Sequence, residues 1–171
     1  MTHISDFSAD EVAQLLDAPG VVLKAMTVAD GPPGVGSFFK AAARSAKAFR
    51  AAQKGENEFV RTLALALRDQ PKAESEAEEG DAEPGESTDF LQPDPEAEAD
   101  RAVEAASASA SLLRGRAEET DIKAYAAWIL DVATQVAEAT TSREGGLFGR
   151  RVRITPAEQA LLDRLTVALT A

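Results

Sequence analysis

Residues 73–100 contain twelve acidic residues and not one Lys or Arg. The whole chain has 18 basic and 29 acidic residues, a net charge of −11, so the remainder is almost neutral, with 18 basic and 17 acidic residues. The acidic stretch is poor in large apolar residues. It cannot bury enough surface to offset the roughly 1–2 kcal/mol per residue that ordering a backbone costs. We therefore predict a disordered acidic linker at residues 72–95, between helical halves at residues 8–71 and 96–171.

Alanine dominates the rest of the composition. Apolar residues make up 44% of the chain, but aromatic residues only 5%. Strands favour β-branched and aromatic side chains, so this composition predicts an all-α fold, a helical bundle of about six or seven helices with a long disordered acidic loop. The first half has only about seventy residues, which is marginal for a separate core. We therefore expect residues 1–171 to form a single helical domain, with two independent lobes as the alternative.

Capping residues and prolines mark several helix boundaries. Ser8 and Glu11 have the spacing of a capping box, and Pro19 is expected to end the short helix that follows because proline lacks a backbone N–H. Thr155 and Glu158, with a proline between them, give the clearest helix start. Together these signals predict helices at residues 9–18, 21–29, 37–54, 58–69, 95–114, 121–144 and 156–169.

The strongest periodic pattern lies in the second half, where Thr120 or Asp121 is expected to cap a helix. Apolar residues then recur at spacings of three and four, as on the buried side of a helix. This predicted core stripe consists of Ile122, Tyr125, Ile129, Val132, Val136 and Ala139.

Little in the sequence suggests catalysis. His3 is the only histidine and there is no cysteine, which excludes triads that need His, thiol chemistry and disulfides. The glycine-rich stretch at residues 31–36 contains two prolines and lacks the Lys-Ser or Lys-Thr of a phosphate-binding loop, so we interpret it as a helix connection. We expect no enzyme activity, no cofactor and no metal.

Localisation is predicted from what the sequence lacks. No segment approaches the roughly 18 apolar residues of a membrane-spanning helix, and the N-terminus lacks the basic and apolar regions of a signal peptide. We expect a cytoplasmic protein.

A basic stripe follows the predicted helix at residues 37–54. Phe38, Ala42, Ala46 and Phe49 are expected to form its core side. The opposite side carries five basic residues at spacings of four, three, three and four: Lys40, Arg44, Lys47, Arg50 and Lys54. Such a helix can bind an anionic membrane, nucleic acid or an acidic peptide, or can simply be solvated.

A second basic group surrounds Leu147 and Phe148, formed by Arg143, Arg150, Arg151 and Arg153. It is either a contact patch for phosphate or carboxylate groups, or a loop whose two apolar residues pack into the core. The acidic linker is either a spacer between the halves or a mask over these basic surfaces, in which case its effect would fall with salt.

The second half resembles the TerB-like domains of tellurite resistance. The resemblance is carried by the helical sequence of residues 132–139 and by the capped helix of residues 154–165, with residues 25–31 similar to the first, related turn. It implies an all-helical fold, a role in stress-response complexes and divalent metal binding through acidic residues. Independently of the resemblance, Asp30, Glu138 and Glu144 are conceivable ligands of a hard cation, although we favour loop capping for them. The second turn departs from the family pattern, because residues 140–143 read Thr-Thr-Ser-Arg in place of Asp-Gly.

The chain also resembles bacterial all-helical proteins of uncharacterised function that carry a Glu-Gly-Gly loop, here residues 144–146, and an Arg-Val pair before the last helix, here residues 151–152. We expect a non-enzymatic interaction or adaptor module with a protein partner, with a stress-related role as one option. The alternative is a peripheral binder of anionic membrane or nucleic acid through the basic helix, autoinhibited by the acidic linker, and TerB-like metal binding is a third hypothesis.

Overall fold

The computed structural model describes residues 2–31, 35–70, 94–139, 142–144, 150–152 and 154–171, with the backbone alone for residues 35–38, 142–144 and 150–152. Residues 72–93 of the predicted acidic linker, which was expected at residues 72–95, lie outside the described residues.

The fold is all-α with six helices in the described residues, as the sequence predicts. They are α1 (Ala9–Val28), α2 (Val35–Ala52), α3 (Glu58–Asp69), α4 (Pro95–Leu113), α5 (Glu119–Ala137) and α6 (Pro156–Thr170). A short 3-10 helix, η1 (Ile4–Asp6), precedes α1. Between α5 and α6, β1 (Ser142–Glu144) pairs antiparallel with β2 (Arg150–Val152), so the predicted α5 is too long at its C-terminal end.

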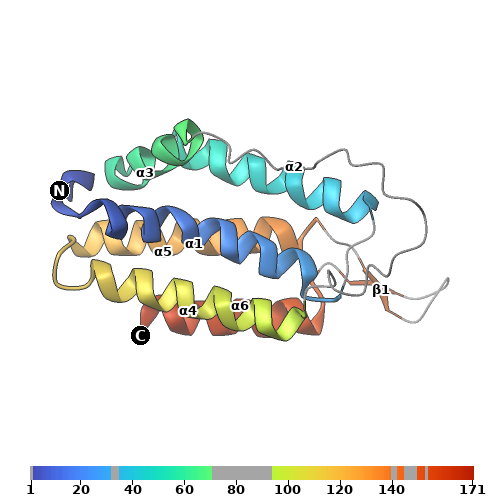
Figure 1. Ribbon diagram of the computed structural model, residues 1–171. Helices are drawn as coiled ribbons and strands as arrows, with labels where there is room; N and C mark the ends of the chain where they lie inside the picture. Colours follow the sequence, from blue (N-terminus) through green and yellow to red (C-terminus); the bar gives the residue numbers. More distant parts are fainter. Residues whose placement is uncertain (1, 32–34, 71–93, 140–141, 145–149, 153) are drawn as a thin grey trace, which may run out of the picture.

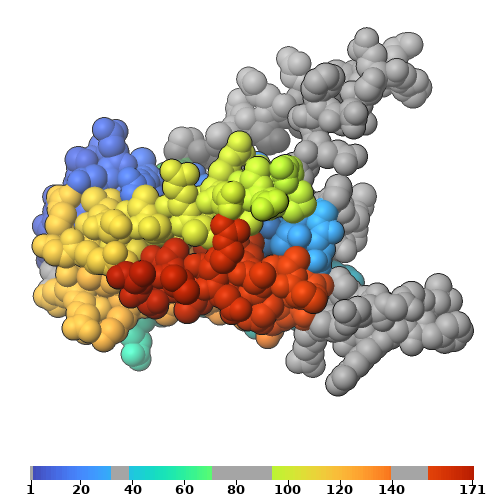
Figure 2. Space-filling view, turned by 90° about the horizontal axis from the view of Figure 1, so that it is seen from below, coloured from blue at the N-terminus to red at the C-terminus, as the bar shows by residue number. Residues whose placement is uncertain are grey.

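The helices lie in three layers (Figure 1). α2 and α3 form one outer layer, α1 and α5 the middle layer, and α4 and α6 the other outer layer, with both chain termini at the same end. α1 packs on α4 and α5, and α2 packs on α5. Figure 2 shows α4 and α6 side by side on the outer face. The helices before the acidic segment therefore bury apolar surface against those after it.

The core combines large side chains from α1, α5 and α6 with alanines from α4. Ala102 and Ala106 are fully buried, and such small side chains let α4 lie close to α1. Most of the predicted stripe on α5 is buried. The fully enclosed members of that helix include Tyr125, Ile129, Val132 and Val136.

The last carboxylates of the acidic stretch belong to the bundle. Asp94 caps α4 by accepting from the backbone N–H of Glu96. Glu98 is only 5% exposed, and its Oε1 lies 2.9 Å from the amine of Lys24 on α1 and 2.9 Å from the guanidinium of Arg101. Glu98 therefore ties the start of α4 to α1, because a buried carboxylate is retained where cations and hydrogen bonds compensate it.

The prediction that Pro19 ends the first helix is wrong. α1 continues through Pro19 to Val28, although a proline in a helix leaves the carbonyl four residues earlier without its usual donor. That carbonyl belongs to Leu15, and the hydroxyl of Tyr125 donates to it at 2.9 Å. A side chain from α5 thus satisfies the hydrogen bond that Pro19 cannot make.

The capping box that opens α6 is confirmed. The backbone N–H of Glu158 donates to the Thr155 hydroxyl at 3.2 Å, and the Thr155 N–H donates to the Glu158 carboxylate at 2.8 Å. The Thr155 hydroxyl in turn donates to Asp30 at 2.9 Å, which joins the start of α6 to the loop after α1.

The prediction that Thr120 or Asp121 caps α5 is wrong, because the N-cap is Glu118 and both residues lie inside the helix. The helix begins at Glu119, and the buried Asp121 side chain accepts hydrogen bonds from the backbone N–H of Thr2 at 2.9 Å and from the amide of Asn57 at 2.7 Å. Asn57 also caps α3 by accepting from Val60. One carboxylate thus joins the N-terminal segment, α3 and α5.

Candidate anion-binding surface

α2 packs on α5 through small side chains. Ala41, Ser45 and Ala48 are buried, and Phe49 is half-buried with its ring edge-on to Trp128 at a centroid distance of 6.0 Å. Ala42 is exposed, so the predicted core side of this helix was misplaced by about one residue. The physical reason is that Ala41 and Ala42 are equally small and apolar, so composition alone cannot tell which of them faces α5.

The five basic residues predicted on the opposite side are all exposed, and we call them the cationic face: Lys40, Arg44, Lys47, Arg50 and Lys54. Four of them, Lys40 to Arg50, lie on α2 and extend over roughly 15 Å of helix at a rise of about 1.5 Å per residue. Lys54 lies in the turn directly after α2. Phe39, next to Lys40, is 66% exposed.

The cationic face has no counter-ions within the described part of the chain. None of its five side chains makes an ion pair or a hydrogen bond there, and the sequence has no acidic residue between Gly31 and Gly55. Most other basic side chains that the structure describes are paired with carboxylates. These ion pairs are Lys24 and Arg101 with Glu98, Arg68 with Asp69, Arg116 with Glu11, Lys123 with Glu119, and Arg164 with Asp100.

The second predicted basic group is described only in part. Arg150 and Arg151 lie in β2, where Arg150 faces Glu144 and Arg151 faces Arg143 across the ladder. Phe148 and Arg153 lie outside the described residues. The structure therefore gives the backbone register of three of these arginines, Arg143, Arg150 and Arg151.

The candidate metal ligands are not gathered into a site in the part of the chain that the structure describes. Asp30 accepts the hydrogen bond from Thr155, and Glu138 is an exposed residue at the end of α5. No group of three or more His, Asp or Glu side chains among the described residues could hold a metal ion. The third candidate ligand, Glu144, is described by its backbone alone.

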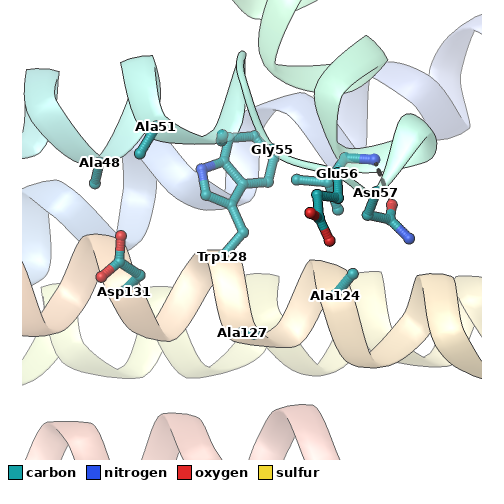
Figure 3. Close-up of a pocket in the computed structure, with 11 residues that line it drawn as sticks. Ala48, Ala51, Gly55, Glu56, Asn57, Ala124, Ala127, Trp128 and Asp131 are labelled. Atoms are coloured by element: carbon teal, nitrogen blue, oxygen red, sulfur yellow. Dashed lines mark hydrogen bonds between the residues drawn. The ribbon is translucent and has the colours of Figure 1, made fainter.

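The sequence did not reveal a pocket of about 340 Å³ between α2, the start of α3 and α5 (Figure 3). Trp128 lines it, and the indole nitrogen of this residue is buried with no hydrogen-bond partner in the structure. The signal available in the sequence was indirect, since alanines at positions 48, 51, 124 and 127 leave space beside a large side chain.

Chemically, this surface can attract anions and seat a small apolar group. No helix within the described ranges is long and apolar enough to cross a membrane. Comparison with protein-family models, with curated proteins and with solved structures finds no match to this chain.

Proposed function

We propose that this chain is a non-enzymatic interaction module that binds an acidic segment of a partner protein on the cationic face of α2. The observation that carries the proposal is the set of five exposed basic side chains without counter-ions among the described residues. Elsewhere in the described chain, basic side chains are mostly neutralised by nearby carboxylates.

The packing of α2 favours a protein partner over a membrane. An amphipathic helix that lies on a membrane buries its apolar side among the lipids. In α2 that side is occupied, because Ala41 and Ala48 are buried in the contact with α5. The exposed ring of Phe39 beside the cationic face also suits a protein contact, since aromatic residues are enriched at protein interfaces.

The overall charge favours a short acidic segment over nucleic acid. The net charge of −11 repels a long polyanion. Screening limits such forces to about 8 Å at physiological salt, so a segment that meets only α2 avoids most of the repulsion. Binding to anionic membranes or nucleic acid is the competing function that the experiment must exclude.

We extend the same proposal to the acidic linker, to the cellular location and to a stress-related role. A linker with this charge can compete with the partner for the cationic face and so act as an autoinhibitor. The absence of cysteine suits a reducing cytoplasm, which is where we place the module. The TerB-like sequence features support a partner from a bacterial stress-response complex.

The test compares two triple variants with the same change in net charge. One is Lys40→Gln/Arg44→Gln/Lys47→Gln on the cationic face, and the control is Arg68→Gln/Arg114→Gln/Lys123→Gln at exposed positions elsewhere. Each is titrated with a labelled oligoglutamate peptide, phosphatidylserine vesicles and duplex DNA, at low and at high salt.

We expect the peptide to bind the full chain at low salt, and the α2 variant to lose about tenfold in affinity, which corresponds to about 1.4 kcal/mol. The control should keep the affinity of the original chain. Equal losses in both variants, or tighter binding to vesicles or DNA than to the peptide, would reject the proposal.

A further inference from the structure

The pocket between α2, α3 and α5 borders the cationic face. Ala51 lines the pocket and is exposed. It follows Lys47 by four residues, so these two lie on one side of α2. Lys54 lies in the turn after α2, next to Gly55, which also lines the pocket. A ligand on these two lysines would therefore also reach the mouth of the pocket.

The walls of the pocket suit an apolar group. Ala48 and Ala51 come from α2, Val60 from α3, and Ala124 and Ala127 from α5. The volume of about 340 Å³ is at the small end of the range for ligand pockets, roughly 300–1,000 Å³. The exposed carboxylates of Glu56 and Asp131 also line this pocket, and they disfavour a second carboxylate inside it.

One buried donor in the pocket lacks an acceptor. Trp128 is 5% exposed, and its indole N–H has no hydrogen-bond partner in the structure. In Figure 3 this nitrogen lies on the edge of the ring that faces Ala51 and Asp131. A buried N–H without an acceptor is costly, so a ligand that brings a carbonyl to this edge gains affinity.

We propose that the pocket receives an apolar anchor side chain of the acidic partner segment, with the Trp128 indole N–H donating to a backbone carbonyl beside the anchor. This inference rests on the proposed function and names the partner more closely: an acidic peptide that carries a Leu- or Phe-sized residue next to its carboxylates. The carboxylates meet Lys47 and Lys54, while the anchor lies against the alanines and Val60 of the pocket. Burial of one such side chain is enough for about a tenfold gain in affinity.

A peptide with the sequence of residues 81–94 is a suitable probe, because it places Phe90 and Leu91 directly after Asp89 in an acidic sequence. The comparator peptide has the same carboxylates and carries Ser in place of Phe90 and Leu91. Both are titrated against the full chain, and the emission of Trp128 reports on the pocket because it is the only tryptophan of the chain. We expect the first peptide to bind about tenfold more tightly than the comparator and to change the Trp128 emission.

Two substitutions on one helix separate filling of the pocket from any general effect on α2. Ala51→Leu fills the pocket without altering a charge, and Ala42→Leu adds the same side chain at an exposed position that does not line the pocket. Ala51→Leu should abolish the advantage of the first peptide, whereas Ala42→Leu should preserve it.

Each contrary result has a distinct meaning. Equal affinity of the two peptides with unchanged Trp128 emission would overturn the anchor pocket and leave the binding of acidic segments in place. Failure of both peptides to bind at low salt would overturn the proposed function as well. A change in Trp128 emission on replacing Phe90 and Leu91 in the chain itself, with no peptide added, would assign the pocket to the chain's own segment and overturn its assignment to a partner.

Discussion

The hydroxyl of Tyr125 on α5 donates to the carbonyl of Leu15 on α1 at 2.9 Å, and this is the carbonyl that Pro19 leaves without a helical donor. Tyr125 is 1% exposed, so the bond is shielded from water. The continuity of α1 therefore depends on a residue in the other half of the chain.

Tyr125→Phe should lower the free energy of unfolding by roughly 1–3 kcal/mol, because it leaves a buried carbonyl without a donor. The loss should be smaller in a Pro19→Ala background, where residue 19 regains an N–H that can donate to Leu15. A double-mutant cycle by urea denaturation measures this coupling. The same loss with and without the Pro19→Ala substitution would show that the two residues act independently.

Tyr125 should also limit stability at alkaline pH. Burial raises the pKa of its phenol, and the nearby Ser109 hydroxyl opposes this with a smaller effect. Above about pH 10 the unfolded chain releases the phenolic proton while the folded chain retains it. The free energy of unfolding should then fall by up to about 1.4 kcal/mol per pH unit.

The measurement is direct because Tyr125 is the only tyrosine. Phenolate absorbance should appear together with unfolding, and Tyr125→Phe should be less sensitive to pH in this range. Ionisation of Tyr125 near pH 10 in the folded chain would contradict the prediction.

Asp121 should contribute to stability at neutral pH and lose that contribution in acid. Burial alone would raise the pKa of Asp121, but the hydrogen bonds from Thr2 and Asn57 outweigh it and hold the pKa below its usual value. The contribution is therefore present above the unfolded pKa of about 3.9 and is lost as the pH falls through the lower folded value.

Asp121→Asn should destabilise the protein at pH 7 and flatten the acid limb of its stability curve, measured by thermal unfolding across pH. The matched control is Asp131→Asn, which replaces an exposed aspartate on the same helix. This variant should change neither the stability at pH 7 nor the acid limb of the stability curve. Equal behaviour of the two variants would show that the contacts of Asp121 do not stabilise the fold.

The sequence predictions were correct where a feature depends on neighbouring residues, and wrong where it depends on residues far apart in the chain. Thr155 and Glu158 were recognisable because a capping box is formed by residues three apart. The continuation of α1 through Pro19 could not be recognised in the same way. The hydrogen bond that replaces the one lost at Pro19 comes from Tyr125, 106 residues further along the chain. The core side of α2 was misplaced since Ala41 and Ala42 are chemically identical, and only the contact with α5 distinguishes them.

The same contrast between local and long-range features applies to the candidate site. The exposure of Lys40, Arg44, Lys47 and Arg50 follows from helical spacing alone, so the sequence was sufficient to predict it. The pocket beside them requires three helices at once, and the unpaired indole N–H of Trp128 is a property of that packing.

The acidic segment should compete for the cationic face. Replacing the carboxylates of residues 73–93 by amides should strengthen binding of the peptide of residues 81–94 at low salt and have little effect at high salt, since screening reduces charge interactions beyond a few ångströms. Fluorescence anisotropy with a labelled peptide provides the measurement. Unchanged affinity at low salt would identify the segment as a spacer.

The most direct test of the account is an NMR titration of the isotope-labelled full chain with the peptide of residues 81–94. Binding on the cationic face predicts that the largest amide shifts fall between Lys40 and Lys54, and that the single indole N–H signal, from Trp128, moves with them. Shifts that concentrate on α4 and α6 while α2 and Trp128 stay unchanged would contradict it.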